Sequence, residues 1–267
     1  MKKEYAISIH NLTKTYGRNR GVTNLTLDVE KGDIFGFLGP NGAGKSTTIR
    51  SLLGLIKFQQ GSASILGMDV KKQHNEILRE VGYMPSEAMF YPSMKVKDVI
   101  RFAADMRKVK CDKEAAMLCE RLLVDTEKRI EELSLGNRKK VSIVCAMQHK
   151  PKLFIFDEPT SGLDPLMQAE FFKLILEYNK QGTTCFLSSH MLSEIKKYCK
   201  HAAIVREGKL ICSDTVENLT KTNAKRIRMI KDGVEENIVY RGNLNELFAG
   251  FAGHDICLLY TSPSPRD

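Results

Sequence analysis

The stretch GPNGAGKST at residues 39–47 constrains the fold of this chain more than any other part of its sequence. It follows a short apolar run typical of a buried strand, and it precedes a segment with helical spacing. The pattern G-x-x-x-x-G-K-[ST] between a strand and a helix indicates a loop whose backbone N–H groups surround phosphates. The residues expected to bind nucleotide in this loop are Gly39, Pro40, Asn41, Gly42, Ala43, Gly44, Lys45, Ser46 and Thr47.

Two side chains of this loop have expected chemical roles. Lys45 would place a positive charge on the β- and γ-phosphates, and Ser46 would offer its hydroxyl to Mg²⁺. The alternative is a glycine-rich turn without a ligand. The glycines themselves fit the first interpretation, because they let the backbone approach phosphates without interference from side chains.

An acidic pair ends a second apolar run, LFIFDEP at residues 153–159. The carboxyl ends of strands are where open α/β sheets bind ligands. We expect Asp157 to hold Mg²⁺ through water, and Glu158 to orient and deprotonate an attacking water molecule. Because side chains alternate along a strand, the two carboxylates would point in different directions. Alone, such a pair would only solvate a strand end; together with the phosphate loop it indicates catalysis.

Two further residues complete this candidate site. His190 follows the apolar run TTCFLSS, and we expect it beside the γ-phosphate, although a histidine at a strand end is more often structural. Tyr16, in TYG upstream of the phosphate loop, offers an aromatic face on which adenine could stack. The alternative for Tyr16 is a core tyrosine at a strand end.

The wider pattern alternates strands with helices and predicts an α/β fold with a parallel sheet. Residues 165–182 form an amphipathic pattern that ends at Gly182, and residues 112–130 also have a helical pattern. The stretch EELSLGNRKKV at 131–141 places Ser134 and Gly136 at the start of another helix. Such a start attracts anions, and it raises the question of which anion binds there.

Together these motifs resemble the nucleotide-binding subunit of ATP-binding cassette (ABC) transporters. The resemblance covers about residues 4–215 and implies a P-loop NTPase domain over 1–215. That domain would have a mainly parallel sheet core, an antiparallel β subdomain and a helical subdomain at about 87–140. GNRKKV and DEPTSGLDPLMQ look most like subunits of bacterial exporters of the multidrug and antimicrobial-peptide type. The matching pieces are Tyr16, GPNGAGKST, LSLGN, LFIFDEP, SGLD and His190.

The resemblance implies that two such domains pair head to tail and bind ATP and Mg²⁺ between them. Ser134, Gly136 and Asn137 would then contact the ATP held by the partner's phosphate loop, and Asp164 would run along the same interface. The alternative for this segment is an ordinary serine N-cap. The complete motif set permits a homodimer, and a heterodimer remains equally open.

Three positions depart from the family's pattern. Leu135 and Asn137 replace a glycine and a glutamine of the usual signature, while the serine and the second glycine remain. Ser86 stands where the loop that couples to the transport subunit usually has glutamine. Serine is shorter and cannot span the same distance to Mg²⁺ and the attacking water without a bridging water. Neighbouring Glu87 is a possible substitute.

Composition limits the setting in which the chain works. No apolar run approaches the roughly 18 residues of a membrane-spanning helix, so we expect the membrane permease to be a separate polypeptide. The seven cysteines form no C-x-x-C pair and indicate reduced thiols. The net charge of +9 suits a cytoplasmic protein on the inner face of a membrane. It would also suit nucleic-acid binding, but the lysines are dispersed and no aromatic-rich basic motif accompanies them, so no nucleic-acid partner is expected.

Other ABC-type proteins provide the rival interpretations. A translation factor would normally carry two cassettes in tandem, and a DNA-maintenance ATPase would carry a long coiled coil between the phosphate loop and the signature. A protein that does not hydrolyse ATP would be expected to lose Lys45 or Glu158, and both are present.

The C-terminal part is expected to differ from the rest. Residues 216–256 predict an unfinished α+β appendage, with two strands about a glycine turn and a short helix in NLNELFAGF. The last segment, CLLYTSPSPRD at 257–267, has two X-Pro pairs and no periodicity, which indicates a tail without regular structure. It also matches the translation of a sequencing-library adapter, so we expect it to be non-native, with the native C-terminus missing.

Overall fold

The computed structural model describes residues 4–17, 21–220, 224–231, 234–241 and 256–263, with side chains up to residue 220. The chain divides into two compact units, Met1–Val216 and Glu217–Asp267. The sequence placed this boundary after residue 215. Every residue expected in the nucleotide site belongs to the first unit.

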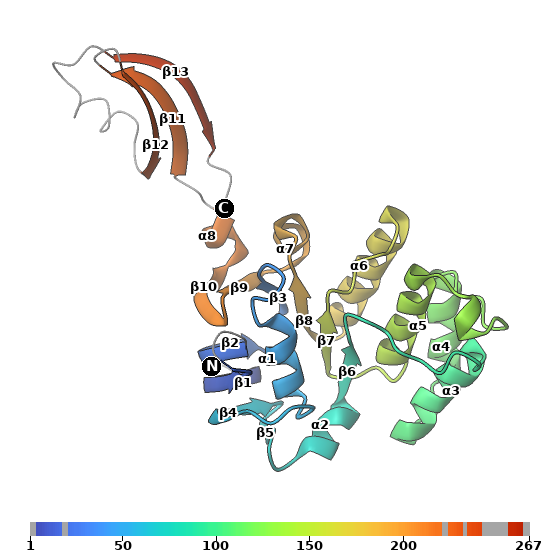
Figure 1. Cartoon of the computed structure of the whole chain (residues 1–267). Helices are drawn as coiled ribbons and strands as arrows, with labels where there is room; N and C mark the ends of the chain where they lie inside the picture. Colours follow the sequence, from blue (N-terminus) through green and yellow to red (C-terminus); the bar gives the residue numbers. More distant parts are fainter. Residues whose placement is uncertain (1–3, 18–20, 221–223, 232–233, 242–255, 264–267) are drawn as a thin grey trace. The chain divides into compact units, whose positions relative to one another are not determined.

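A six-stranded sheet forms the centre of the first unit, in the order β10-β9-β3-β8-β7-β6 (Figure 1). Its strands are β3 (Ile34–Leu38), β6 (Val81–Met84), β7 (Leu153–Asp157), β8 (Thr184–Ser189), β9 (His201–Arg206) and β10 (Lys209–Thr215). All pair in parallel except β10, which returns antiparallel along β9. The predicted mainly parallel core is therefore confirmed.

The register of three central strands decides where the site forms. Leu38 of β3 pairs with Ser189 of β8, and Asp157 of β7 pairs with Ser188. The carboxyl ends of β3, β7 and β8 thus stop at one level of the sheet. The loops that carry the phosphate motif, Glu158 and His190 consequently emerge side by side.

An antiparallel sheet packs against this centre, in the order β2-β1-β4-β5. It contains β1 (Tyr5–Thr15), β2 (Gly21–Glu30), β4 (Gln60–Ile65) and β5 (Met68–Asp69). Helix α1 (Lys45–Leu52) contacts strands of both sheets. Its Ile49 and Leu52 are fully buried in a shared core with Phe37, so this core fixes the helix that starts at the phosphate loop.

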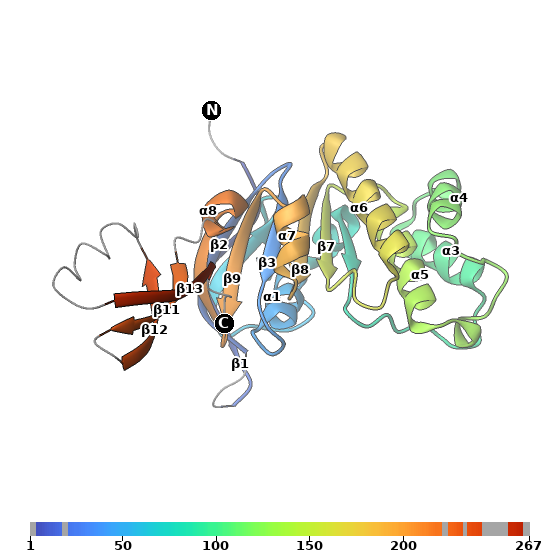
Figure 2. The same ribbon diagram turned by 90° about the horizontal axis from the view of Figure 1, so that it is seen from above.

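Other helices border or cover the parallel sheet (Figure 2). α6 (Pro165–Lys180) and α7 (Leu192–Tyr198) contact β8, while α2 (His74–Glu80) leads into β6. Phe171 of α6 packs on Phe156 of β7 with ring centroids 5.6 Å apart. Gly182 follows α6 with φ of 101°, the conformation for which glycine was expected there.

The helical region contains α3 (Val96–Arg107), α4 (Asp112–Arg121), the short 3₁₀ helix η1 (Ile130–Glu132) and α5 (Leu135–Met147). The expected helix over 112–130 is too long, because the chain leaves α4 through Leu123 in the left-handed region. Helix α5 contacts β6, α3 and α4, and so joins this region to the parallel sheet.

The second unit contains a three-stranded antiparallel sheet, β12-β11-β13. β11 (Ala224–Lys231) and β12 (Val234–Arg241) are the two strands expected from the sequence. Helix α8 (Val216–Thr220) precedes them. The expected short helix in NLNELFAGF lies outside the described residues.

The expectation of a tail without regular structure is wrong for its first part. β13 (Ile256–Pro263) pairs with β11 over most of the segment CLLYTSP. Leu258, Tyr260 and Thr261 are residues compatible with a strand, and the open edge of β11 gives them a backbone to pair with. Composition alone does not reveal such an edge.

Among the helices that the structure describes, none is long and apolar enough to cross a lipid bilayer.

Candidate functional site

The phosphate loop connects β3 to α1 and depends on glycine at three positions. Gly42 and Gly44 have φ of 80° and 101°, which side-chain-bearing residues rarely adopt. A Cβ on Gly39 would come within 2.4 Å of the Val205 carbonyl oxygen, and one on Gly44 within 2.8 Å of that of Gly21. The glycines thus provide the turn and permit close backbone packing, while the approach to phosphates expected from the sequence stays a prediction.

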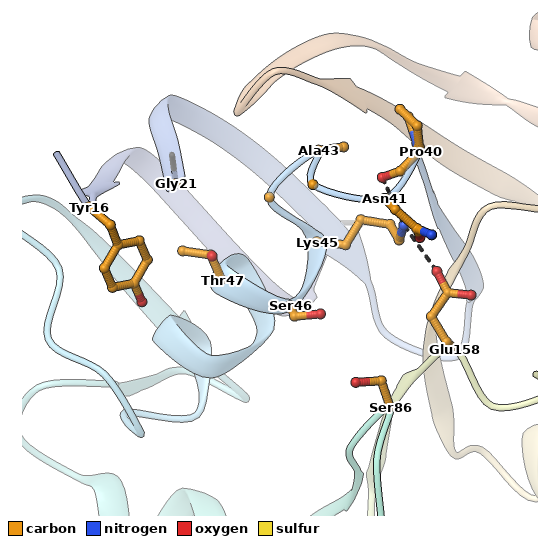
Figure 3. Close-up of a pocket in the computed structure, with 12 residues that line it drawn as sticks. Tyr16, Gly21, Pro40, Asn41, Ala43, Lys45, Ser46, Thr47, Ser86 and Glu158 are labelled. Atoms are coloured by element: carbon orange, nitrogen blue, oxygen red, sulfur yellow. Dashed lines mark hydrogen bonds and ion pairs between the residues drawn. The ribbon is translucent and has the colours of Figure 1, made fainter. Parts of the chain in front are cut away.

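The loop borders a cavity of about 650 Å³, a volume that suits a nucleotide (Figure 3). Its lining brings together the phosphate loop, Tyr16 from the end of β1, Ser86 after β6 and Glu158 after β7. The full set is Tyr16, Gly21, Pro40, Asn41, Gly42, Ala43, Gly44, Lys45, Ser46, Thr47, Ser86 and Glu158.

Lys45 lies within this cradle as a buried cation. Its side chain is 6% exposed, and its Nζ donates to the carbonyl oxygens of Gly39 at 2.6 Å and Pro40 at 3.2 Å. The same ammonium lies 3.0 Å from Oε1 of Glu158. The contact drawn in Figure 3 therefore joins the expected phosphate-binding cation to the expected base.

Asp157 ends β7 and is 1% exposed. Its Oδ1 accepts a hydrogen bond from Ser188 Oγ at 2.6 Å, whereas its buried Oδ2 has no hydrogen-bond partner. Mg²⁺ prefers oxygen donors. The Asp157 oxygen without a hydrogen-bond partner and the Ser46 hydroxyl at the cavity are both donors of this kind.

Among the residues described with side chains, no group of three or more His, Cys, Asp or Glu residues could hold a metal. A Mg²⁺ ion does not require such a group, because it is usually bound by one or two carboxylates together with substrate phosphates and water. Asp157 and Ser46 thus offer oxygen donors of the kind that Mg²⁺ uses, and a Mg²⁺ site formed by them stays a prediction.

Glu158 lies between two partners in a constrained backbone conformation. Its φ is 53°, and its side chain is 16% exposed. Oε2 lies 2.7 Å from Nδ1 of His190, and Oε1 contacts Lys45. His190 does not line the cavity itself. It reaches the site through Glu158, and its position beside a γ-phosphate stays a prediction.

Ser188 is the residue of this site that sequence reasoning missed. Its fully buried hydroxyl donates to Asp157 and accepts from the N–H of Glu158 at 3.0 Å. From the neighbouring strand it thereby holds the Asp157 carboxylate and the Glu158 backbone. The motif SSH contains it, but only the register of β7 against β8 shows which serine faces Asp157.

Tyr16 lines the cavity at the end opposite Glu158 (Figure 3). It is 48% exposed, so the alternative of a core tyrosine is wrong. Lys14 Nζ lies 4.7 Å from the centre of its ring. One face of the ring therefore meets a cation, and an aromatic surface remains for a base to stack upon.

Comparison with known proteins identifies the class to which this site belongs. The family model of the ABC transporter matches residues 22–161. The bacitracin transport ATP-binding protein BcrA of Bacillus licheniformis is 39% identical over 224 residues, covering 82% of this chain and 72% of that protein. The chain belongs to the ABC transporter ATP-binding family.

Further relatives agree with this assignment. The uncharacterised ABC transporter ATP-binding protein YhaQ of Bacillus subtilis is 36% identical and covers 82% of this chain and 74% of its own. A solved ATP-binding subunit of an ABC transporter superposes with a TM-score of 0.75 at 26% identity, over 92% of this chain and 99% of that one. The protein is thus an ABC ATPase, an ATP-hydrolysing subunit of a transporter.

The signature segment of this ABC ATPase does not reach its own cavity. Ser134 is the N-cap of α5, and its Oγ accepts from the N–H of Asn137 at 3.3 Å. None of Ser134, Gly136 and Asn137 is among the lining residues, and Figure 1 shows β6 and β7 between α1 and α5. The N-cap alternative is therefore correct as a local description, although the hydroxyl keeps its hydrogen for a second acceptor.

Two other expected positions have clear locations. Asp164 is the exposed N-cap of α6 and accepts from the N–H of Met167 at 3.0 Å. Ser86 lines the cavity, whereas Glu87 is exposed and is not part of the lining. The structure therefore does not bring Glu87 to the place from which the usual glutamine is missing.

Proposed function

We propose that this ABC ATPase binds Mg-ATP in the cavity at the phosphate loop and pairs head to tail with a second nucleotide-binding subunit. The pair would drive a separate membrane permease at the cytoplasmic face of the membrane. The observation that carries this proposal is the separation of Ser134 and Gly136 from a cavity that contains the other nucleotide-binding groups. A signature that cannot reach its own site is available to a partner's site.

Each residue of the cavity has a proposed role. Lys45 binds the β- and γ-phosphates, and Tyr16 stacks on the adenine. Ser46 and Asp157 hold Mg²⁺, which would neutralise phosphate charge when bound. Glu158 accepts the proton of the attacking water, and His190 orients Glu158 through the 2.7 Å contact.

The pairing is proposed from exposed apolar side chains near the starts of α5 and α6. Leu135 is 65% exposed and directly follows Ser134, and Leu166 is 78% exposed and lies two residues after Asp164. Such apolar side chains at two helix starts suit a surface that a second subunit covers. Ser134 and the backbone N–H of Gly136 would contact the partner's γ-phosphate, and loss of that phosphate after hydrolysis would open the pair.

The direction of transport is proposed from the relatives. One is named a bacitracin transport ATP-binding protein, another a linearmycin resistance ATP-binding protein and a third a probable multidrug ABC transporter ATP-binding protein. We infer an export system for amphipathic or antibiotic-like compounds. An ABC-type ATPase in translation or DNA maintenance is the alternative.

The experiment compares Glu158→Gln with Glu158→Gln/Ser134→Arg. Glu158→Gln should bind ATP, lose turnover by about 10²–10⁴-fold, and elute as a dimer with Mg-ATP. Adding Ser134→Arg should keep ATP binding by the monomer and abolish the dimer. If Ser134→Arg instead lowers the affinity of the monomer for ATP, the signature belongs to its own subunit's site and the proposal is overturned.

A further inference from the structure

Lys139 is a buried cation that the roles proposed above do not use. It lies one turn into α5 and is 4% exposed. Its Nζ donates to two backbone carbonyl oxygens across the domain, that of Glu158 at 2.6 Å and that of Ser161 at 2.7 Å. The ammonium therefore joins α5 to the turn that follows β7.

The turn that Lys139 contacts carries an unfavourable backbone conformation. Glu158 has φ of 53°, in the left-handed region that costs a residue with a side chain free energy and persists only where its surroundings hold it. Two bonds hold it here. Ser188 Oγ accepts from the N–H of Glu158, and Lys139 donates to its carbonyl oxygen. These bonds orient the residue whose carboxylate meets Lys45 and His190.

The start of α5 contacts the same segment of chain. A Cβ on Gly136 would come within 2.7 Å of the Gly162 carbonyl oxygen, so helix and loop pack backbone to backbone. Lys139 repeats this connection one turn further along the helix. A displacement of the signature helix would therefore move the turn that bears Glu158.

A purely stabilising role does not explain a lysine at this place. Burial lowers the pKa of Lys139, and the carboxylates of Glu158 and Asp157 act in the opposite direction. Removing an ammonium from water is costly, and well-packed apolar residues commonly replace buried charges at little loss of stability. The two carbonyl contacts instead give Lys139 a geometric function.

We propose that Lys139 is a positioning residue, which ties the signature helix to the Glu158–Ser161 turn and sets the Glu158 carboxylate for hydrolysis. The link has a further consequence that rests on the proposed head-to-tail dimer. When Ser134 and Gly136 of one subunit grip the partner's ATP, Lys139 transmits the position of α5 to Glu158 of the same subunit. Binding of ATP at one site of the dimer would thus change the position of Glu158 at the other site.

The first experiment measures steady-state ATP hydrolysis by Lys139→Met, Lys139→Arg and Lys140→Met. Lys140 is the matched control, because it is the neighbouring lysine of the same helix and is also buried, at 8% exposure. We expect Lys139→Met to lower kcat by about 10- to 100-fold, the cost typical of a slightly misplaced catalytic group, with little change in KM for ATP. Lys139→Arg should recover part of the loss, since a guanidinium can donate to both carbonyls.

The second experiment separates this inference from the proposed dimer. Glu158→Gln/Lys139→Met should still form the Mg-ATP dimer that Glu158→Gln forms, because the signature itself is intact. If Glu158→Gln alone forms no dimer, the proposed pairing fails, while the kcat effect still decides the role of Lys139. If Glu158→Gln forms the dimer and Glu158→Gln/Lys139→Met does not, Lys139 acts in assembly and the positioning role is overturned.

The thermal unfolding midpoint shows whether each variant is folded, and Lys139→Gln replaces Lys139→Met if the latter is not. An unchanged kcat in the folded variant, Lys139→Met or the Lys139→Gln that replaces it, overturns the inference. An equal loss of kcat in Lys140→Met does the same, because it would show a general effect of removing a buried amine from α5.

Discussion

At the scale of single residues, Lys45 has partners that make its contribution measurable. Its ammonium is buried against Glu158 and two loop carbonyls. Lys45→Met keeps the stem and removes the charge, so ATP loses a charge-assisted contact and affinity should fall by about 10- to 100-fold. Titration with a fluorescent ATP analogue measures this. Lys31→Met, at an exposed pair with Glu4, is the control, and equal affinity in the two variants would contradict the role of Lys45.

His149 provides a residue-scale prediction about pH. Burial, aided by the nearby positive charge of Arg107, lowers the pKa of His149 from 6.5 to about 4. The unfolded chain therefore binds a proton below pH 6.5 that the folded chain does not, and the fold loses stability as pH falls from about 6.5 to about 4. This amounts to about 2 kcal/mol by pH 5.

The measurement is urea unfolding at pH 7 and at pH 5. His149→Phe should lose less stability between these two pH values than the wild type does, by about the same 2 kcal/mol. An equal loss in both proteins would show that His149 titrates normally in the folded state.

These residues also show what the sequence could predict. Lys45 and Ser46 belong to one short motif that ends in the first turn of α1, so a local pattern was enough to predict that they line the cavity. Ser188 and Lys139 act on a strand end far away in the chain, and only the pairing of β7 with β8 and the packing of α5 select them. Lys139 and Lys140 are the same residue type in adjacent positions, so the sequence cannot show which of them contacts the turn after β7.

At the scale of elements, the strands with an apolar pattern were predictable and the edge strand was not. β3, β7 and β8 are buried along almost their whole length and therefore consist mainly of apolar residues without alternation. β13 pairs along one edge only, with β11. Its formation depends on the open backbone of that neighbour, which no pattern within residues 256–263 can reveal.

The loop between β6 and α3 has an element-scale prediction. Met89 and Tyr91 are 88% and 72% exposed, so neither side chain packs inside the helical region. Exposed apolar side chains that follow Ser86 suit a contact with the permease. Tyr91→Cys should crosslink to a co-expressed permease in membranes, and Met89→Lys/Tyr91→Lys should uncouple transport while leaving ATP hydrolysis by the isolated subunit unchanged.

Ile211→Lys is the control for this loop, because Ile211 is also exposed, at 60%, but lies on β10. Transport that is lost equally in both variants would indicate a general effect of surface charge. Transport that survives in the loop variant would remove this loop from the permease contact.

At the scale of the whole molecule, all groups of the nucleotide site lie in the unit Met1–Val216, and the second unit supplies none of the lining residues described. Hydrolysis by one molecule should therefore not depend on the β12-β11-β13 sheet. Solution behaviour should depend on it, because removal of β13 leaves β11 with an unpaired edge, and such edges promote association between chains.

Two truncations test this division of roles. A chain of residues 1–255 loses β13 and should keep its ATPase rate per molecule while aggregating faster in light scattering. A chain of residues 1–220 keeps α8 and removes the whole sheet, so it should keep the same rate without the added aggregation. The outcome that contradicts this view is a soluble 1–220 protein with a reduced ATPase rate, since the second unit would then act on the nucleotide site.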